Sequence, residues 1–194
     1  FGGRANIRWA QRRIVRVGNS LSVTLQDISA RKANEDALYR SANEDLLTGL
    51  PNRHWMSHAF HAALAKAGHE GRALPLLSID LDEFKQVNDA HGHAVGDMVL
   101  QQAARRIKAL LRPDDVLVRF GGDEFTVLLA EDHSDAHVSS VAQRIIDALV
   151  RPFSVGEQLH SVGASIGISV FPRDGAEPIT LLRHADIAMY WAKE

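Results

Sequence analysis

The sequence predicts an α+β fold in which helices surround a mixed central β-sheet. Strand-like and helix-like segments alternate along most of the 194 residues, and two strand-like segments flank the stretch RFGGDEF at 119–125 as an expected hairpin. Hydrophobic residues make up 45% of the chain. This length and composition suffice for one well-buried domain but not for two ordinary ones. We therefore expect one domain with a short additional piece.

The segment before residue 45 has its own pattern, which indicates a hairpin followed by a helix. Strand-like residues 5–17 and 20–29 surround a Gly-Asn-Ser cluster that suits a turn. A lone hairpin is marginally stable in water, so we interpret this one as the end of a larger sheet. Residues 27–45 mix alanine, leucine and charge, which fits an exposed helix. This helix is either a parallel coiled-coil connector or a solvated linker, because fewer than four heptads are present.

From Leu46 onward the pattern indicates a single mixed domain. Its helical segments carry apolar residues on one face, as Val99, Ala103 and Ile107 do, and its strand-like segments are short and apolar. We expect helices at 51–67, 96–111, 136–150 and 178–193, and strands at 74–81, 116–120, 125–130 and 163–171.

Charge and composition exclude several classes of partner. The net charge of -2 leaves no basic stripe for a phosphate backbone, so we do not expect nucleic acid as a partner. The absence of cysteine excludes disulfides and thiolate metal sites, and it fits a reducing compartment. No apolar run approaches the ~20 residues of a membrane span, and the first residues show no signal peptide. We expect a cytoplasmic chain without direct membrane contact, even if the parent protein is tethered upstream.

Two acidic clusters carry the chemistry. In RFGGDEF, Gly121 and Gly122 permit positive φ and close ligand approach, and Asp123 and Glu124 follow them at the hairpin tip. The same letters also suit an ordinary turn.

The second cluster ends the strand PLLSIDLDEF. Asp80 and Asp82 are two residues apart and share one face of an extended strand. If one of them lies beside the hairpin tip, three or four carboxylates converge, and such a cluster suits Mg²⁺. Magnesium beside a glycine-lined approach suggests a nucleoside triphosphate undergoing in-line displacement at phosphorus.

Five motifs follow one another along the chain: DLLTGLPNR (45–53), DLDEFKQVNDAHGHAVGD (80–97), RFGGDEF (119–125), SIGIS (165–169) and ADIAMYWAK (185–193). In their order and spacing they resemble the GGDEF domain, the diguanylate cyclase family. WAQRRIVR and DISARKANEDAL before them resemble the end of a PAS sensor domain and the helix that joins it to a GGDEF domain. The resemblance implies a PAS remnant at 1–27, a linker helix at 28–44 and a GGDEF domain of nucleotidyl-cyclase, palm-like fold at 45–194.

The resemblance implies a site for Mg²⁺ or Mn²⁺. Asp80, the backbone carbonyl of Leu81 and Glu124 match the metal ligands of the family. Asp123 matches either a ligand of a second metal or the base that accepts the proton of the attacking hydroxyl. Both roles of Asp123 stay open.

The resemblance also implies a GTP site. Asn88 and Asp97 match the guanine readers, since a carboxylate and an amide can accept from the guanine N–H donors. Asp97 has an alternative role as the N-cap of a helix starting at Met98, and both roles are compatible. An aspartate at position 97 also favours GTP over ATP. The remaining nucleotide contacts are expected from Gly121, Gly122, Phe84, Lys85 and Lys193.

The family's Gly-Arg-Asn segment, which usually follows the A-K pair, is absent because the chain stops at Glu194. We therefore expect weaker GTP binding than in the parent protein.

A separate pattern resembles the family's inhibitory product site. Arg112 and Asp115 form an R-x-x-D pattern at the expected offset before Gly121, and Arg144 resembles the arginine that completes this site. R-x-x-D also occurs by chance, and here it can be a helix-ending arginine before a proline turn.

Two further groups have simpler interpretations. His54, His58 and His61 share one helix face, but no acidic or cysteine partner is fixed nearby, so we do not expect zinc there. The family suggests an ion pair between Asp45 and Arg53 at the domain entrance, whose importance would lie in transmitting the helix position rather than in stability.

The leading hypothesis is a diguanylate cyclase. Two GTP molecules, one on each subunit of a Mg-dependent homodimer, would give cyclic di-GMP and two pyrophosphates, with product inhibition. The alternative is a non-catalytic GTP-binding module that controls an EAL phosphodiesterase domain located C-terminally in the parent protein. The complete acidic set argues against this alternative. A third possibility, a structural dimerisation module, predicts no nucleotide binding.

Overall fold

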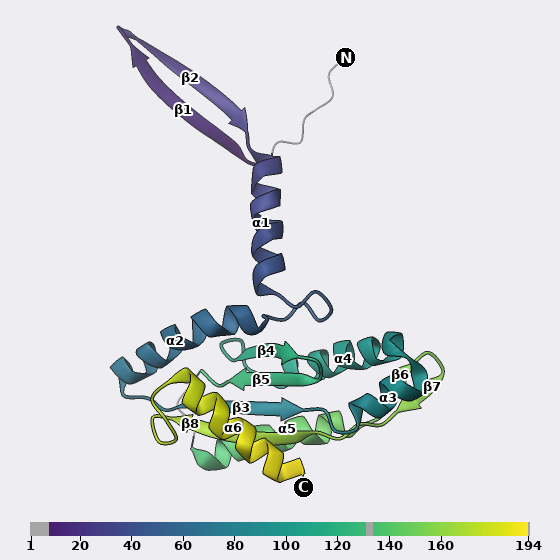
Figure 1. Cartoon of the computed structure of the whole chain (residues 1–194). Coiled ribbons are helices and arrows are strands. Elements are labelled where there is room, and N and C mark those ends of the chain that lie inside the picture. Colours follow the sequence, from purple (N-terminus) through teal and green to yellow (C-terminus); the bar gives the residue numbers. More distant parts are fainter. Residues whose placement is uncertain (1–7, 131–133, 194) are drawn as a thin grey trace. The chain divides into compact units, whose positions relative to one another are not determined.

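A computed structural model describes residues 8–130 and 134–193 (Figure 1). The chain divides into two compact units, one up to Ala42 and one from Asn43 onward. No helix within the described ranges is long and apolar enough to cross a membrane.

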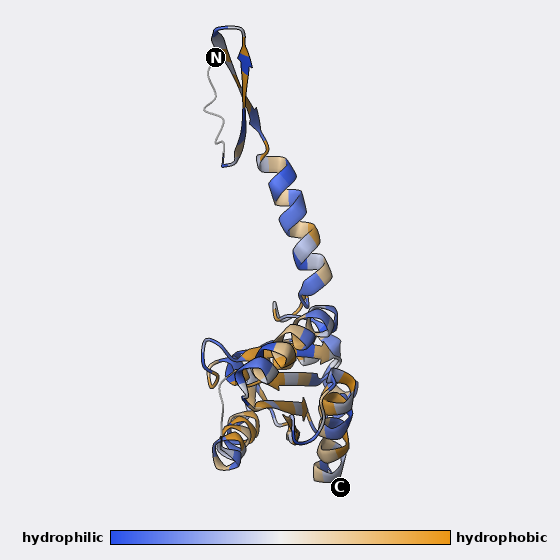
Figure 2. Ribbon diagram, turned by 90° about the vertical axis from the view of Figure 1, so that its left-hand side faces the viewer, coloured by the Kyte–Doolittle hydropathy of each residue, from blue (hydrophilic) through white to orange (hydrophobic). Residues whose placement is uncertain are grey.

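The first unit consists of a hairpin and most of one helix. Strands β1 (Ala10–Val17) and β2 (Ser20–Asp27) pair antiparallel around Gly18, which has a φ of 61°. Helix α1 (Ser29–Asn43) follows and buries none of its residues. The hairpin strands are exposed along their whole length, so residues 8–42 form no core of their own. Hydrophobic and hydrophilic residues alternate visibly along both strands (Figure 2). The predicted hairpin and helix are confirmed, and their assignment to a PAS remnant and a linker stays a prediction.

The second unit is built on a four-stranded sheet in the order β4-β5-β3-β8. The pairs between these strands are all antiparallel, and an isolated parallel bridge joins Asn52 to Arg119. The predicted α+β architecture is therefore confirmed, but the expectation of a mixed sheet is wrong, because the four strands pair only antiparallel to one another. The bounds are β3 (Leu74–Asp80), β4 (Val116–Gly121), β5 (Glu124–Leu128) and β8 (Ser165–Phe171).

Helices cover both faces of this sheet because its strands are apolar on both sides. In β3, Leu74 and Leu76 belong to a core cluster with α2 and α6, whereas Leu77 and Ile79 belong to a cluster with α3, α4 and α5. This alternation follows from the two-residue period of a strand. The helices are α2 (Arg53–Glu70), α3 (Phe84–His91), α4 (His93–Lys108), α5 (Asp135–Leu149) and α6 (Pro178–Lys193).

Three local features differ from the sequence-based expectation. Helix α2 begins after Asn52, whose side chain accepts a hydrogen bond from the Trp55 N–H at 2.9 Å, rather than at Pro51. Helix α3 was not expected, because its eight residues are too few to show a clear period. A small hairpin of β6 (Phe153–Val155) and β7 (Gln158–His160) was also missed, because its strands are only three residues long.

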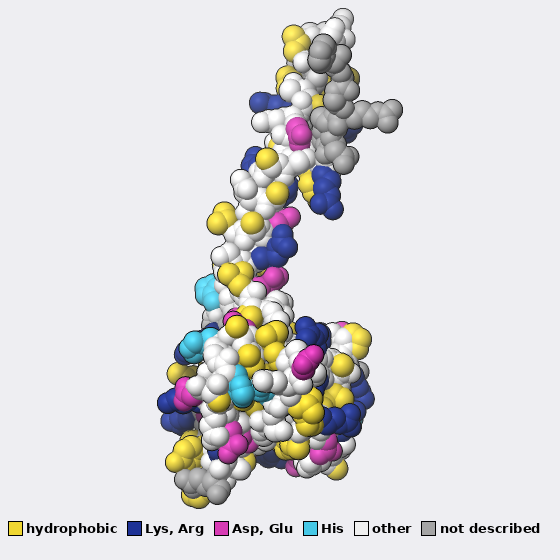
Figure 3. All heavy atoms as spheres, turned by 90° about the vertical axis from the view of Figure 1, so that its right-hand side faces the viewer, with side chains coloured by type: hydrophobic (Ala, Val, Ile, Leu, Met, Phe, Trp, Pro, Cys, Tyr) yellow, Lys and Arg dark blue, Asp and Glu magenta, His cyan; other side chains and the backbone are white. Residues whose placement is uncertain are grey.

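Side chains of both charges are interspersed on the face of the second unit that Figure 3 shows. No continuous basic surface appears on this face.

Candidate active site

The carboxylates of the two acidic clusters meet at one end of the sheet. Asp80 is the last residue of β3 and pairs in register with Glu124, the first residue of β5. On its other side Asp80 pairs with Ser165 of β8. The central strand therefore carries one acid to the hairpin tip, as the sequence predicted.

The hairpin tip is fixed to the end of β3. Gly122 adopts a φ of 50°, a conformation that favours glycine, and allows the chain to reverse before Asp123. The Leu81 N–H donates to the Asp123 carbonyl at 3.3 Å. This bond holds Leu81, whose carbonyl is a predicted metal ligand, next to the predicted carboxylates.

The site is short of positive charge. Burial raises the pKa of Glu124, and repulsion from Asp186, Asp80 and Asp123 raises it further. Burial also raises the pKa of Asp123, with an additional contribution from Asp80. Carboxylates that resist ionisation in this way are stabilised by an added cation.

Lys193 supplies one cation. Its ammonium group, on the last turn of α6, lies 2.5 Å from an Asp80 carboxylate oxygen. The hydrogen bond to Asp80 raises the pKa of Lys193. Lys193 is 44% exposed and Asp80 only 14%, so the lysine reaches from the surface into the site.

Asp186 is a fourth acid of the site, and the sequence interpretation missed it. The Ser78 hydroxyl of β3 donates to the Asp186 carboxylate at 2.7 Å, which anchors α6 to the central strand. Asp186 also lines a hollow of about 460 Å³ between α2 and α6, together with Arg53 and Tyr190. Its place in the motif ADIAMYWAK was the available signal, but a helical acid gives no register with distant strands.

Asp82 lies beyond the end of β3, and its negative charge adds to the effect of the Asp80 hydrogen bond in raising the pKa of Lys193. Strand β3 ends at Asp80, and the Asp82 carboxylate accepts from the Ser165 hydroxyl at 2.9 and 3.1 Å. A Cβ atom at Gly163 would lie 2.9 Å from this carboxylate, so glycine permits the close approach. Asp82 therefore ties the end of β3 to the start of β8.

The predicted guanine readers lie on adjacent helices. Asn88 of α3 packs against α4 so closely that a Cβ atom on Gly96 would lie 2.0 Å from its side-chain oxygen. Asp97, which follows Gly96 in α4, is exposed. Helix α4 begins at His93, so the alternative role of Asp97 as an N-cap is wrong. The contacts of Asn88 and Asp97 with guanine stay a prediction.

The other predicted nucleotide contacts have different exposures. Phe84 is buried at the start of α3, which limits its contact with a ligand, whereas Lys85 is exposed beside it. Gly121 and Gly122 are exposed at the hairpin.

Arg119 joins the hairpin to the domain entrance. Its guanidinium donates to both Asp45 carboxylate oxygens, at 2.9 and 3.0 Å, and to the Gly122 carbonyl at 2.7 and 3.1 Å. The expected pair of Asp45 with Arg53 is therefore wrong, because Arg53 instead lies over the Phe120 ring at 4.9 Å. The sequence interpretation quoted Arg119 within its motif but gave it no role.

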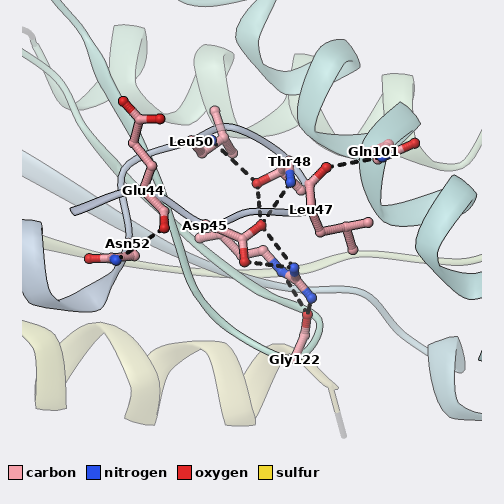
Figure 4. A network of polar contacts seen from close by, with 9 residues as sticks. Glu44, Asp45, Leu47, Thr48, Leu50, Asn52, Gln101 and Gly122 are labelled. Carbon is pink, nitrogen blue, oxygen red and sulfur yellow. Dashed lines mark hydrogen bonds and ion pairs between the residues drawn. The ribbon is translucent and has the colours of Figure 1, made fainter. Parts of the chain in front are cut away.

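Asp45 also orders the loop that leads into α2. Its carboxylate accepts from the Thr48 hydroxyl at 2.6 Å and from the Thr48 N–H at 2.9 Å. The Leu47 carbonyl of the same loop accepts from Gln101 of α4 at 3.0 Å (Figure 4). Burial works against ionisation, but the bonds from Thr48 and Arg119 lower the pKa of Asp45 overall.

The predicted product-site residues occupy two elements. Asp115 is 5% exposed, and its carboxylate oxygens accept from the Arg112 N–H at 2.9 Å and the Ala130 N–H at 3.1 Å. This gives Asp115 a structural role in the turn before β4. Arg112 is exposed in that turn, and Arg144 is exposed on α5. Their role in binding a ligand stays a prediction.

The histidine face of α2 holds no metal cluster. The His54 and His58 rings lie edge to face at 4.8 Å, and His61 bonds to the Ser57 carbonyl at 2.9 Å. Across residues 8–130 and 134–193, no three His, Asp or Glu side chains are already arranged to hold a metal ion. The acidic site therefore offers suitable oxygen donors whose final arrangement would depend on the ligand.

A family comparison identifies the class of protein that this fold and site define. The model of the GGDEF domain, described as "Diguanylate cyclase, GGDEF domain", matches residues 42–194. The chain belongs to this family.

Individual relatives agree with the family match. The diguanylate cyclase TpbB of Pseudomonas aeruginosa is 41% identical over 177 residues, which are 90% of this chain and 41% of TpbB. A structure of the TpbB GGDEF domain has a TM-score of 0.75 at 42% identity, covering 77% of this chain and 88% of that one. The cyclic di-GMP phosphodiesterase PdeR of Escherichia coli is 39% identical over 87% of this chain and 25% of its own length.

A further structure, the coiled coil and GGDEF domain of DgcB from Caulobacter crescentus in complex with c-di-GMP, has a TM-score of 0.73 at 26% identity. It covers 87% of this chain and 95% of that one. In contrast, the chain spans between about a fifth and two fifths of the first curated relatives.

Proposed function

We propose that this chain is the catalytic part of a diguanylate cyclase, which condenses two GTP molecules into cyclic di-GMP and two pyrophosphates. The observation that carries the proposal is the register that places Asp80 beside Glu124, with Lys193 bonded to Asp80. Family membership and the 41% identity to TpbB support the same activity.

The acidic residues fit a divalent cation. Asp80, Glu124 and the Leu81 carbonyl would hold Mg²⁺ or Mn²⁺, since hard oxygen donors suit these ions. Burial first, and repulsion from neighbouring acids second, raise the pKa of Asp123 and Glu124, so a bound cation would stabilise their ionised forms. When bound, the ion neutralises triphosphate charge and polarises the oxygens around phosphorus.

The chain's own residues would position the nucleotide. Lys193 is placed to pair with terminal phosphate oxygens once these displace Asp80, and Gly121 and Gly122 leave the hairpin backbone open to the phosphates. Asn88 and Asp97 would accept and donate at the guanine edge from adjacent helices. Asp123 lies beside Asp80, and its raised pKa suits a group that accepts a proton from a 3′-hydroxyl.

One chain would hold one GTP, so the reaction needs two chains. Each 3′-hydroxyl attacks the α-phosphate of the other nucleotide, and pyrophosphate leaves as each new phosphodiester forms. We propose a homodimer for this reason, and the linker helix is a candidate for its control.

We also propose product inhibition through Arg112, Asp115 and Arg144, supported by their offset from the hairpin and by the c-di-GMP complex of DgcB.

Turnover of GTP tests the activity. The purified chain, at high concentration with GTP and Mg²⁺, is expected to form cyclic di-GMP detectable by chromatography. Glu124→Gln removes a metal ligand without changing size and should lower the rate more than about 100-fold, since such ligands contribute several kcal/mol. The matched control is Glu157→Gln, an exposed position in the turn between β6 and β7, which should keep the native rate. Equal rates in the two variants would refute the metal assignment.

A second candidate function is a GTP-binding module that controls a phosphodiesterase domain. It is favoured by the identity to PdeR, a cyclic di-GMP phosphodiesterase. GTP binding in a thermal-shift assay, together with no formation of cyclic di-GMP, would support this function over the cyclase. Both results should persist when two chains are joined by an artificial dimerising segment. Absence of any GTP binding would instead indicate a structural dimerisation module.

A further inference from the structure

Two polar contacts join α6 to the central strand β3, one after the other along both elements. The Ser78 hydroxyl donates to the Asp186 carboxylate at 2.7 Å, and the Lys193 ammonium donates to the Asp80 carboxylate at 2.5 Å. Ser78 and Asp80 are two residues apart and share one face of the strand. Asp186 and Lys193 are seven residues apart, about two turns, and share one face of the helix. The helix therefore follows the strand in the same direction between the two contacts.

The Ser78 hydroxyl is a buried polar group in an otherwise apolar part of β3. Ser78 is 5% exposed, and its neighbours Leu77 and Ile79 are fully buried. A buried hydroxyl without an acceptor costs stability, whereas an apolar side chain at the same place has no such requirement. The bond to Asp186 meets this requirement. It therefore determines where along β3 the Asp186 side chain lies.

A glycine on the neighbouring strand lets α6 come close enough for this bond. Gly167 of β8 pairs in register with Ser78 of β3. A Cβ atom at Gly167 would overlap the Ala185 carbonyl oxygen and the Met189 nitrogen of α6. The helix backbone therefore lies directly against β8 at the level of Ser78. The close approach and the Ser78 bond together fix α6 at one level of the sheet.

Lys193 depends on this fixed level. It lies in the last turn of α6, and its side chain is 44% exposed. A lysine side chain is long and flexible, so the position of its ammonium group is only as well defined as its contacts make it. Because Asp186 and Lys193 share one face of α6, a rotation of the helix would carry both away from β3. The bond that holds Asp186 to Ser78 therefore also holds Lys193 toward the carboxylate site.

We propose that the bond between Ser78 and Asp186 positions Lys193 for the terminal phosphates of a nucleoside triphosphate. This inference rests on the proposed function, in which Lys193 pairs with these phosphates. Asp186 is then a positioning residue that acts through Lys193, and it is neither a metal ligand nor a phosphate contact. The fourth acid of the site thus has a role different from those of Asp80 and Glu124.

A double-mutant cycle of nucleotide affinity tests the proposal. The whole chain is titrated calorimetrically with 3′-deoxy-GTP in excess Mg²⁺, because this probe lacks the attacking hydroxyl and binds without turnover. Lys193→Met should weaken binding about 10-fold, since it removes a charge-assisted bond to phosphate. Ser78→Ala changes no charge and should weaken binding about 3-fold or more. In the Lys193→Met chain, Ser78→Ala should weaken it no further, because the bond acts through the lysine.

Ser169→Ala is the matched control. Ser169 is fully buried in β8, and its hydroxyl donates to the Leu181 carbonyl of α6 at 2.9 Å. This variant also loses a buried bond between the sheet and α6, but twelve residues before Lys193. It should therefore keep the native affinity. Equal weakening in Ser78→Ala and Ser169→Ala would show a general loosening of α6 and would overturn the proposal.

A second variant keeps the test decisive if Ser78→Ala does not fold, which circular dichroism checks. Asp186→Ala breaks the same bond from the exposed side and should also weaken binding. Loss of its negative charge would by itself favour an anionic nucleotide, so weaker binding points to the lost bond. Unchanged affinity in the folded variants would overturn the proposal. An equal loss on Ser78→Ala with and without Lys193 would overturn it too.

The outcome is separable from the fate of the proposed function. Failure of the native chain to make cyclic di-GMP from GTP would refute the cyclase activity, whereas the cycle with 3′-deoxy-GTP reports binding alone. Failure of the native chain to bind 3′-deoxy-GTP would refute the nucleotide site, and the positioning role of Asp186 with it.

Discussion

Two carboxylates near the GGDEF hairpin, Asp45 and Glu124, differ in how their charge is compensated. Asp45, at the domain entrance, accepts bonds from Thr48 and, on both carboxylate oxygens, from one Arg119 guanidinium nitrogen, and its pKa is lowered. Glu124, at the sheet end, has no cation bonded to it among the described residues, and its pKa is raised by burial and by neighbouring acids.

This difference separates a structural acid from a candidate metal-binding acid. Asp45 is satisfied within the chain and holds the entrance loop to the hairpin through Arg119. Glu124 is destabilised as it stands and gains from an external cation. Sequence letters alone do not distinguish the two, because both are acids next to glycine-containing turns.

The largest effect on stability is expected from Asp45→Ala. It removes the acceptor for Thr48 and leaves the half-buried Arg119 without its carboxylate, which costs about 2 kcal/mol of unfolding free energy. Urea denaturation of the second unit measures this. Asp147→Ala, which removes an exposed acid on α5, is the control and should change stability by less than about 0.5 kcal/mol. Similar costs for both would remove the structural role of Asp45.

A smaller effect of opposite sign is expected from Glu124→Gln. The neutral amide relieves repulsion from Asp186, Asp80 and Asp123, so the thermal midpoint should rise slightly at neutral pH without divalent metal. Differential scanning calorimetry in the presence of a chelator measures it. A clear fall in the midpoint would show that Glu124 stabilises the fold and would end the contrast with Asp45.

The smallest expected effect is the change with pH of the two stability differences, that of the Asp45 variant and that of Glu124→Gln. The folded-state pKa of Asp45 is below the ordinary 3.8, so its stabilisation is present above about pH 4 and is lost as the pH falls through the folded value. The folded-state pKa of Glu124 is above 4.5, so its destabilisation develops as the pH rises from the unfolded to the folded value.

Below about pH 4, the stability of both variants should therefore approach that of the native chain, with the Asp45 variant rising toward it and Glu124→Gln falling toward it. In the scans at acidic pH, Asp45→Asn is used instead of Asp45→Ala, because asparagine preserves the size of the aspartate side chain. Calorimetric scans from pH 3 to 7 would check the two signs. A difference for Glu124→Gln that grew on acidification would contradict the raised pKa.

The sequence predicted the helices and strands that are long enough to show a hydrophobic period, and the motifs that occur in a fixed order. Apolar runs and glycines indicated the strand end and the hairpin tip, whereas the pairing of Asp80 with Glu124 in one site was implied by the resemblance to the GGDEF family. The sequence interpretation missed α3 and the hairpin of β6 and β7, which are too short for a period to appear. It also paired Asp45 with the wrong arginine, since Arg53 and Arg119 are equally plausible until the bridge between Asn52 and Arg119 sets their positions.

By itself the sequence determined the family and the α+β class and supplied the candidate acids of the site, because these depend on local patterns of residue type. Only the tertiary structure decided which partner each acid has. It assigned Asp82 to Ser165, Asp186 to Ser78 and Asp80 to Lys193, each more than 80 positions away along the chain. Such pairings depend on strand register and helix packing, which arise when the whole core closes around the sheet.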